Sequence, residues 1–221
     1  MNRIPLRKTP CRKKLCFLLL MSWVVMDVTA QNVVYSNLKG LLACEGDTVA
    51  SLKVEKRTKN HILMTGGADY KISAGPDDSM CKYLKSRCYA VQADTSLYVN
   101  CKRLRYKKFR FGGWYAPALR IGDHIYFSAI PLGSVAAGSD ATMDVMLGGQ
   151  FGDAIAASAL ISKRVYYEID PETNKVGFVG KERMGELLGG HPDWKAAYLN
   201  ENSESAKVTD KYLRLLKAEE K

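Results

Sequence analysis

Six basic side chains lie within nine residues, from Lys102 to Arg110, and they are interleaved with Tyr106 and Phe109. Cationic groups at this density could bind a phosphate, an acidic glycan or an anionic lipid head group. The ordinary alternative is a strand whose solvent-facing side is charged, which discourages edge-to-edge aggregation. The residues that we expect in a basic-aromatic binding surface are Arg103, Arg105, Lys107, Lys108, Arg110, Trp114 and Tyr115.

Paired strands are expected to position this surface. Gly112-Gly113 lies between the aromatic segments 109–111 and 114–116, and such a pair predicts a hairpin turn. Pro117 should end the second strand or place it on an edge, because proline has no backbone donor. The alternation of charge slips at Lys107-Lys108, which predicts a bulge.

The three histidines give a weaker indication of catalysis. His61, expected in a strand, His124 and His191 each lack a second ligand or base at an informative spacing. No known nucleophile, zinc, P-loop or dinucleotide motif is present, so we predict no catalytic residue, metal or cofactor. An alternative function is a hydrolase around His124, which requires a carboxylate within hydrogen-bond reach in a concave pocket.

Four cysteines remain after the first 30 residues, and an even number in an exported chain permits two disulfides. With a two-residue turn at Asp94-Thr95, Cys88 falls opposite Cys101 in a hairpin. A three-residue turn would instead misalign them, and the sequence leaves this register open. Our hypothesis pairs Cys88 with Cys101, and Cys44 with Cys81.

Residues 1–30 have the features of a secretory signal peptide. A basic start precedes an apolar run of 11 residues, Leu15–Val25, which is too short to span a bilayer, and Val28-Thr29-Ala30 is typical of a cleavage site. These residues hold 6 of the 33 basic and one of the 23 acidic residues, so their removal lowers the net charge from +10 to +5. Half of the net positive charge therefore belongs to the targeting segment, which argues against a nucleic-acid partner.

The remainder, 31–221, is expected to form a single α+β domain. Antiparallel hairpins over 88–101 and 165–179, with strands at 70–73 and 124–130, should form the sheet. A Gly/Ala-rich crossover, 131–162, follows, and 181–221 is the helical C-terminal part. Further helices are expected to begin at Pro76-Asp77, at Pro192 and after Ser203 or Ser205.

The small-residue segment 145–161 suggests another alternative, peripheral membrane association. Gly148, Gly152 and Ala156 recur at every fourth position, as in closely packed membrane helices. Asp144 and Asp153 interrupt the apolar residues, so no transmembrane span is expected after residue 30.

Several whole segments carry a resemblance to a known family. They are DYKI, LYVNCKRLRY, FRFGGWYA, IYFSAI and RVYYEIDPETNKVGFVG with the helices after it. In these segments the chain resembles an uncharacterised family of exported proteins from Bacteroides-type bacteria, a domain of unknown function. The resemblance implies the exported compartment and a shared fold, and it transfers no functional residues.

Together these features favour a non-enzymatic, envelope-associated binding or interaction module. The expected partner is an anionic envelope glycan, lipid or protein, met in the periplasm, in the outer envelope or outside the cell. The expected contact surface is the basic-aromatic segment from Arg103 to Tyr115.

Overall fold

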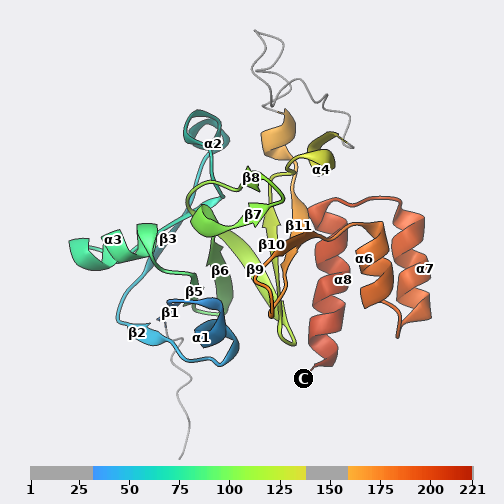
Figure 1. Ribbon diagram of the computed structural model, residues 1–221, viewed down its shortest axis with the longest axis horizontal. Helices are drawn as coiled ribbons and strands as arrows, with labels where there is room; N and C mark the ends of the chain where they lie inside the picture. The colour runs from blue at the N-terminus through green and yellow to red at the C-terminus, as the bar shows by residue number, and fades with distance from the viewer. Residues whose placement is uncertain (1–31, 138–158, 221) are drawn as a thin grey trace, which may run out of the picture.

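The chain folds around one large antiparallel sheet, and the computed structural model describes residues 32–137 and 159–220 (Figure 1). The strands are β1 (Asn32–Tyr35), β2 (Asp47–Val49), β3 (Lys53–Lys56), β4 (Tyr70–Ser73), β5 (Ala90–Ala93), β6 (Ser96–Asn100), β7 (Arg105–Tyr106), β8 (Phe109–Arg110), β9 (Tyr115–Ile121), β10 (His124–Ala129), β11 (Val165–Ile169) and β12 (Val176–Phe178). The helices are α1 (Leu38–Leu42), α2 (Lys59–Thr65), α3 (Asp78–Ser86), α4 (Ser134–Ala137), α6 (Lys181–Leu187), α7 (Pro192–Glu201) and α8 (Ala206–Glu219).

The strands of the large sheet run in the order β12-β11-β10-β9-β6-β5-β1-β2, and β4 joins β3 to β9. All of the pairings are antiparallel. The short hairpin β7–β8 forms a separate two-stranded sheet. The α+β class with an antiparallel sheet and C-terminal helices is therefore confirmed.

Both faces of the central strands are buried, because successive side chains of a strand point to opposite sides. On β10, Ile125 and Phe127 join a cluster with residues of α1 and of the β7–β8 segment, whereas Tyr126 faces the other side. There it packs with Tyr198 of α7 and Tyr212 of α8. Figure 1 shows α6, α7 and α8 grouped at one side of the sheet, and α3 at the opposite end.

Several local predictions are confirmed. The predicted hairpin over 88–101 forms from β5 and β6, and the pairing of Ala93 with Ser96 shows that its turn, whose length the sequence left open, has two residues. The Asp77 side chain caps α3 by accepting from the Met80 amide at 2.9 Å, as its position before the helix predicts. Pro192 begins α7, and Ser205 precedes α8.

The prediction of a hairpin turn at Gly112-Gly113 is wrong. The tight turn lies at Lys107-Lys108, between β7 and β8, where a bulge was expected. The glycines serve a tertiary contact instead: a Cβ on Gly67 would meet the Gly113 carbonyl oxygen at 2.4 Å, and the Ala68 amide donates to that oxygen at 2.8 Å. This close approach of two backbones is the reason for glycine here.

Two further predictions are corrected. Pro117 neither ends a strand nor lies on an edge: it lies inside β9, opposite Tyr98, at the point where the β10 ladder stops at Ala118. Its missing donor therefore interrupts no pairing there. His61 lies in α2 and not in a strand, because the Thr58 side chain caps a helical turn and accepts from its amide at 3.2 Å.

The disulfide hypothesis is also corrected, because Cys44, Cys81, Cys88 and Cys101 are all free thiols. The two-residue turn does give the register that brings Cys88 opposite Cys101. However, β5 begins only at Ala90, and Cys101 begins a 3-10 turn. The two thiols leave the ladder and pack in different clusters of the core.

Two expectations concern parts of the chain outside the described residues: the signal peptide, 1–30, and nearly all of the small-residue segment 145–161. Within 32–137 and 159–220, no helix has the length and apolar character needed to cross a membrane.

Candidate functional site

Three of the predicted surface residues line one hollow of about 710 Å³, which we call the basic hollow. Arg103, Arg105 and Lys107 come from the β7–β8 segment, and Lys175 comes from the β11–β12 loop. The remaining lining residues are Ser36, Asn37, Leu38, Tyr89, Leu104, Asn174 and Val176. No aspartate or glutamate lines the hollow, so all of its charged lining residues are cationic.

The cations of the basic hollow are not neutralised by the protein. Among the described residues, none of the six basic residues from Lys102 to Arg110 takes part in an ion pair, and neither does Lys175. Lys107 Nζ donates to the neutral Ser134 Oγ at 3.4 Å and lies 5.3 Å from the Tyr106 ring centroid, so neither contact cancels its charge. An anion would therefore find unpaired donors at this position.

The β7–β8 hairpin holds its cations outward by anchoring its apolar side chains. Leu104 and Tyr106 are buried, while Arg103, Arg105 and Lys107 are exposed. The Tyr106 ring packs 5.4 Å from that of Tyr167 on the large sheet. The alternation of a strand thus places the charged side chains away from the core.

The hairpin carries two local costs. Arg105 lies directly opposite Arg110, and like charges opposite each other destabilise a strand pair. Lys107 has a φ of +54°, a left-handed conformation that favours glycine. Proteins tolerate such local conflicts chiefly at functional sites.

The opposite wall is fixed by the loop between β11 and β12. The Asp170 side chain accepts from the amides of Glu172 and Thr173 at 2.9 and 2.7 Å, which shapes the turn. The Tyr89 hydroxyl donates to Asn174 Oδ1 at 3.0 Å. Burial raises the pKa of Tyr89, so that hydroxyl keeps its proton at neutral pH. Lys175 is therefore held beside the hollow by a stiff turn.

The other predicted surface residues lie elsewhere. Lys108 is over the Phe109 ring at 5.6 Å, and Arg110 lines a smaller hollow beside Gly67. Trp114 is half-buried beneath Arg57, whose guanidinium carbon is 5.4 Å from the ring centroid. Tyr115 is 1% exposed and donates to the Leu84 carbonyl at 2.7 Å, so it belongs to the core and not to a binding surface.

His124, the centre of the alternative site, lines a hollow of about 530 Å³ together with Glu168 and Arg183. Its Nδ1 lies 2.7 Å from Glu168 Oε1. The geometry of a hydrogen bond is not met between these two atoms, so they are in close contact without an aligned hydrogen bond. The carboxylate that the hydrolase hypothesis requires is nevertheless present.

Glu168 is almost fully engaged by its neighbours. Arg183 donates to both of its oxygens, at 2.7 and 2.9 Å, and the Tyr126 hydroxyl donates at 3.0 Å. Burial by itself raises the pKa of Glu168, but the bonds and charge of Arg183, with Tyr126 and His124, outweigh it and lower that pKa. Glu168 is thus an ionised anchor that ties α6 to β11.

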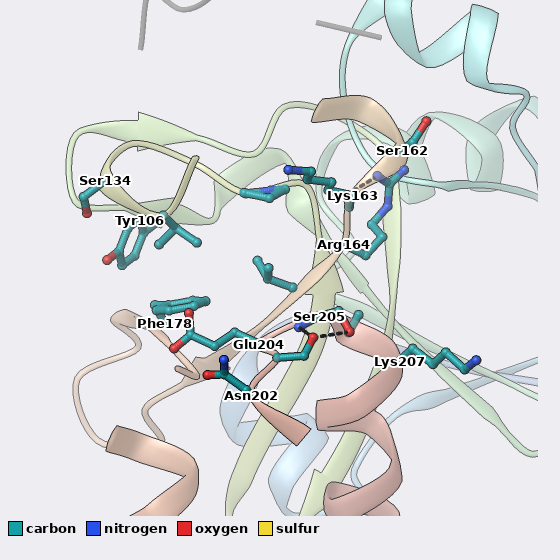
Figure 2. A pocket seen from close by; sticks show the side chains of 15 residues that line it. Tyr106, Ser134, Ser162, Lys163, Arg164, Phe178, Asn202, Glu204, Ser205 and Lys207 are labelled. Atoms are coloured by element: carbon teal, nitrogen blue, oxygen red, sulfur yellow. Dashed lines mark hydrogen bonds between the residues drawn. The ribbon is translucent and has the colours of Figure 1, made fainter. Parts of the chain in front are cut away.

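A larger hollow than the basic hollow, about 900 Å³, lies between β7, β12 and the start of α8. Figure 2 shows Tyr106 and Phe178 on one side and Arg164 on the other. Arg164 is paired with Asp69, Nε to Oδ2 at 2.8 Å, and Glu204 accepts from the Lys181 amide at 2.7 Å. Its charges are therefore mixed and partly satisfied, unlike those of the basic hollow.

Sequence reasoning missed the wall opposite the hairpin. Asn37, Tyr89, Asn174 and Lys175 are distant in the chain from Arg105, and only the turn signal at 170–175 could have drawn attention to that loop. Among the described residues, no group of histidine, cysteine, aspartate and glutamate is arranged to hold a metal ion.

Comparison with known proteins gives a match to the model of a family of unknown function (DUF6563), and the match covers residues 33–220. No curated protein and no solved structure matches the chain. The family description carries no activity that could be transferred to these residues.

Proposed function

We propose that this chain, which belongs to that family of unknown function, is a non-enzymatic module that binds an anionic ligand in the basic hollow. The observation that carries the proposal is the meeting of Arg103, Arg105, Lys107 and Lys175 around about 710 Å³ without one acidic lining residue. Cations brought together at a cost in repulsion are compensated when an anion binds between them.

The hollow suggests what kind of anion would bind. Its volume is in the range of small-molecule sites, about 300–1,000 Å³. Two guanidinium groups, two ammonium groups and the amides of Asn37 and Asn174 offer donors to sulfate, phosphate or carboxylate groups. A short acidic glycan or a phosphorylated head group fits this chemistry.

Export is part of the same proposal. The basic start, short apolar run and small residues of 1–30 support secretion into the envelope of a Bacteroides-type bacterium. An envelope-associated module would meet anionic glycans, lipids or proteins there. Mass spectrometry of the protein from its host should find Gln31 as the first residue, and a retained 1–30 would contradict export.

The binding test compares two variants that remove equal charge. The first replaces Arg103, Lys107 and Lys175 by serine, and the second replaces Lys82, Lys85 and Arg87 of the α3 region. Calorimetric titration of residues 31–221 with a sulfated disaccharide and with glycerol phosphate should lose at least about tenfold in affinity only for the first variant. Equal losses, or none, would overturn the proposal.

One observation favours a second candidate, the hydrolase around His124. This histidine lines a hollow and has a carboxylate oxygen 2.7 Å away, close enough to orient a general base once the ring turns to align its N–H. Hydrolysis of ester and glycoside probes that disappears in His124→Ala, and survives in a variant with only Arg103→Ser and Lys107→Ser, would support it, since Lys175 also lines the His124 hollow. Equal rates in the parent chain and in the His124→Ala protein would remove this candidate function.

A further inference from the structure

The short helix α2 carries an unusual exposed apolar tip. Ile62, Leu63 and Met64 are consecutive, but only Ile62 is buried, whereas Leu63 is 43% and Met64 82% exposed. Leu199 is the one other large apolar side chain that is exposed in the described parts of the chain. Two of these three side chains thus lie side by side, on an element that projects from the body in Figure 1.

The tip is held in place by a buried arginine. Arg57 is 7% exposed, and its Nη1 donates to the carbonyls of Gly66 and Ala68 at 2.9 and 2.7 Å. Its Nη2 lies 3.4 Å from the His61 carbonyl oxygen. One guanidinium therefore binds a carbonyl within α2 and two carbonyls just after it, so the apolar tip is held on a fixed support.

The charge around the tip has one sign. Between Glu55 and Asp69 the chain has basic residues at 56, 57 and 59 and no carboxylate. The two flanking acids are already neutralised, because Glu55 pairs with Lys53 and Asp69 pairs with Arg164. Exposed apolar side chains next to basic residues complement an anionic lipid surface.

We propose that α2 inserts Leu63 and Met64 into the interface of an anionic membrane. The projecting tip is too small for a stable protein interface, which buries about 800 Å² on each partner. Insertion into a lipid interface needs no complementary surface, and its strength grows with apolar area plus attraction of Lys56 and Lys59 to anionic head groups. This contact is independent of the basic hollow and gives the module a way of lying on the envelope.

The test is sedimentation of residues 31–221 with vesicles of phosphatidylcholine alone and of phosphatidylcholine mixed with phosphatidylglycerol. Leu63→Ser with Met64→Ser should lower partition into the mixed vesicles by at least about tenfold. Leu199→Ser is the matched control, since it also removes an exposed leucine, and it should bind like the parent chain. Met64→Leu should retain binding.

Three results would overturn the proposal. Unchanged partition of the Leu63→Ser, Met64→Ser protein would show that α2 does not insert. Loss of partition in the Arg103→Ser, Lys107→Ser, Lys175→Ser protein, with full retention in the α2 variant, would place the lipid contact in the basic hollow. Binding of the parent chain to neither vesicle, with α2 instead protected by an envelope protein, would assign the tip to a protein partner.

Discussion

Arg105 and Arg110 lie directly opposite each other on the β7–β8 hairpin, and neither has an acidic partner among the described residues. The hairpin is only two strands wide and stands apart from the large sheet. Repulsion across it is a cost to folding that an anion in the neighbouring basic hollow would reduce.

Reversing one of these charges should stabilise the fold. Arg110→Glu creates an opposite-charge pair with Arg105, and we expect the free energy of unfolding to rise by about 0.5 kcal/mol. Arg110→Ser, which removes the repulsion without adding attraction, should give a smaller gain. Urea unfolding at low salt measures both, and a loss of stability in Arg110→Glu would contradict the repulsion.

The bonds that Glu168 accepts from Arg183 and Tyr126 should contribute to the loss of stability at low pH. Glu168→Gln removes the less exposed of the two carboxylates that Arg183 binds and leaves it only Glu186, so we expect the free energy of unfolding to fall by about 2 kcal/mol at neutral pH. The pKa of Glu168 is lowered in the folded protein from its ordinary 4.5. Its contribution is therefore present above pH 4.5 and is lost as the pH falls through the lowered folded value.

Unfolding curves of the parent chain and the Glu168→Gln protein, taken from neutral pH downward, check this sign. The difference between them should shrink below pH 4.5. A difference that grows on acidification would mean that Glu168 is held protonated.

The cysteines should differ in reactivity. Cys44 is exposed, whereas Cys88 and Cys101 are buried and burial raises the pKa of both thiols. We expect Ellman's reagent to modify Cys44 at once in the native protein, and Cys88 and Cys101 only on unfolding. Peptide mapping without reduction is the check, and a Cys88–Cys101 cross-linked peptide from the native protein would refute the free-thiol assignment.

Arg57 should be critical for the α2 region. Arg57→Ala leaves the buried Ala68 carbonyl and the part-buried Gly66 carbonyl without this donor, and we expect a loss of about 2 kcal/mol in the free energy of unfolding. Arg57→Lys should lose less, since an ammonium group keeps one point of donation. Limited proteolysis should cut the alanine variant near α2 first. Equal stability of all three proteins would refute the anchoring role.

Strand identity was predictable where local pattern and tertiary environment agree. The alternation and turn residues of 88–101 and 165–179 specify hairpins, and Asp77 and Pro192 mark helix starts that the structure has. The prediction failed at Gly112-Gly113, because Gly112 is required by the close backbone of Gly67, 45 positions earlier in the chain, where an added Cβ would meet the Gly67 Cα at 2.9 Å. A residue type alone does not distinguish a turn from a close tertiary contact.

Only the part of the candidate site that is contiguous in the sequence could be predicted. Arg103, Arg105 and Lys107 are adjacent, so their density is visible in the sequence, whereas Asn37 and Lys175 meet them only through the fold. Trp114 and Tyr115 resembled surface aromatics beside those charges, but Tyr115 is buried because it begins the central strand β9, and Trp114 just before it is half-buried. Glu168, the partner of His124, gave no sequence signal because its strand reads as an ordinary one.

The most direct test of anion binding is an NMR titration of residues 31–221, labelled with ¹⁵N, with a sulfated disaccharide and with inorganic phosphate. Saturable shifts should concentrate on the amides of Arg103, Arg105, Lys107, Asn174 and Lys175, and they should weaken as salt is added. Shifts confined to the α3 region or to the surroundings of His124, or no saturable shift at all, would contradict anion binding in the basic hollow.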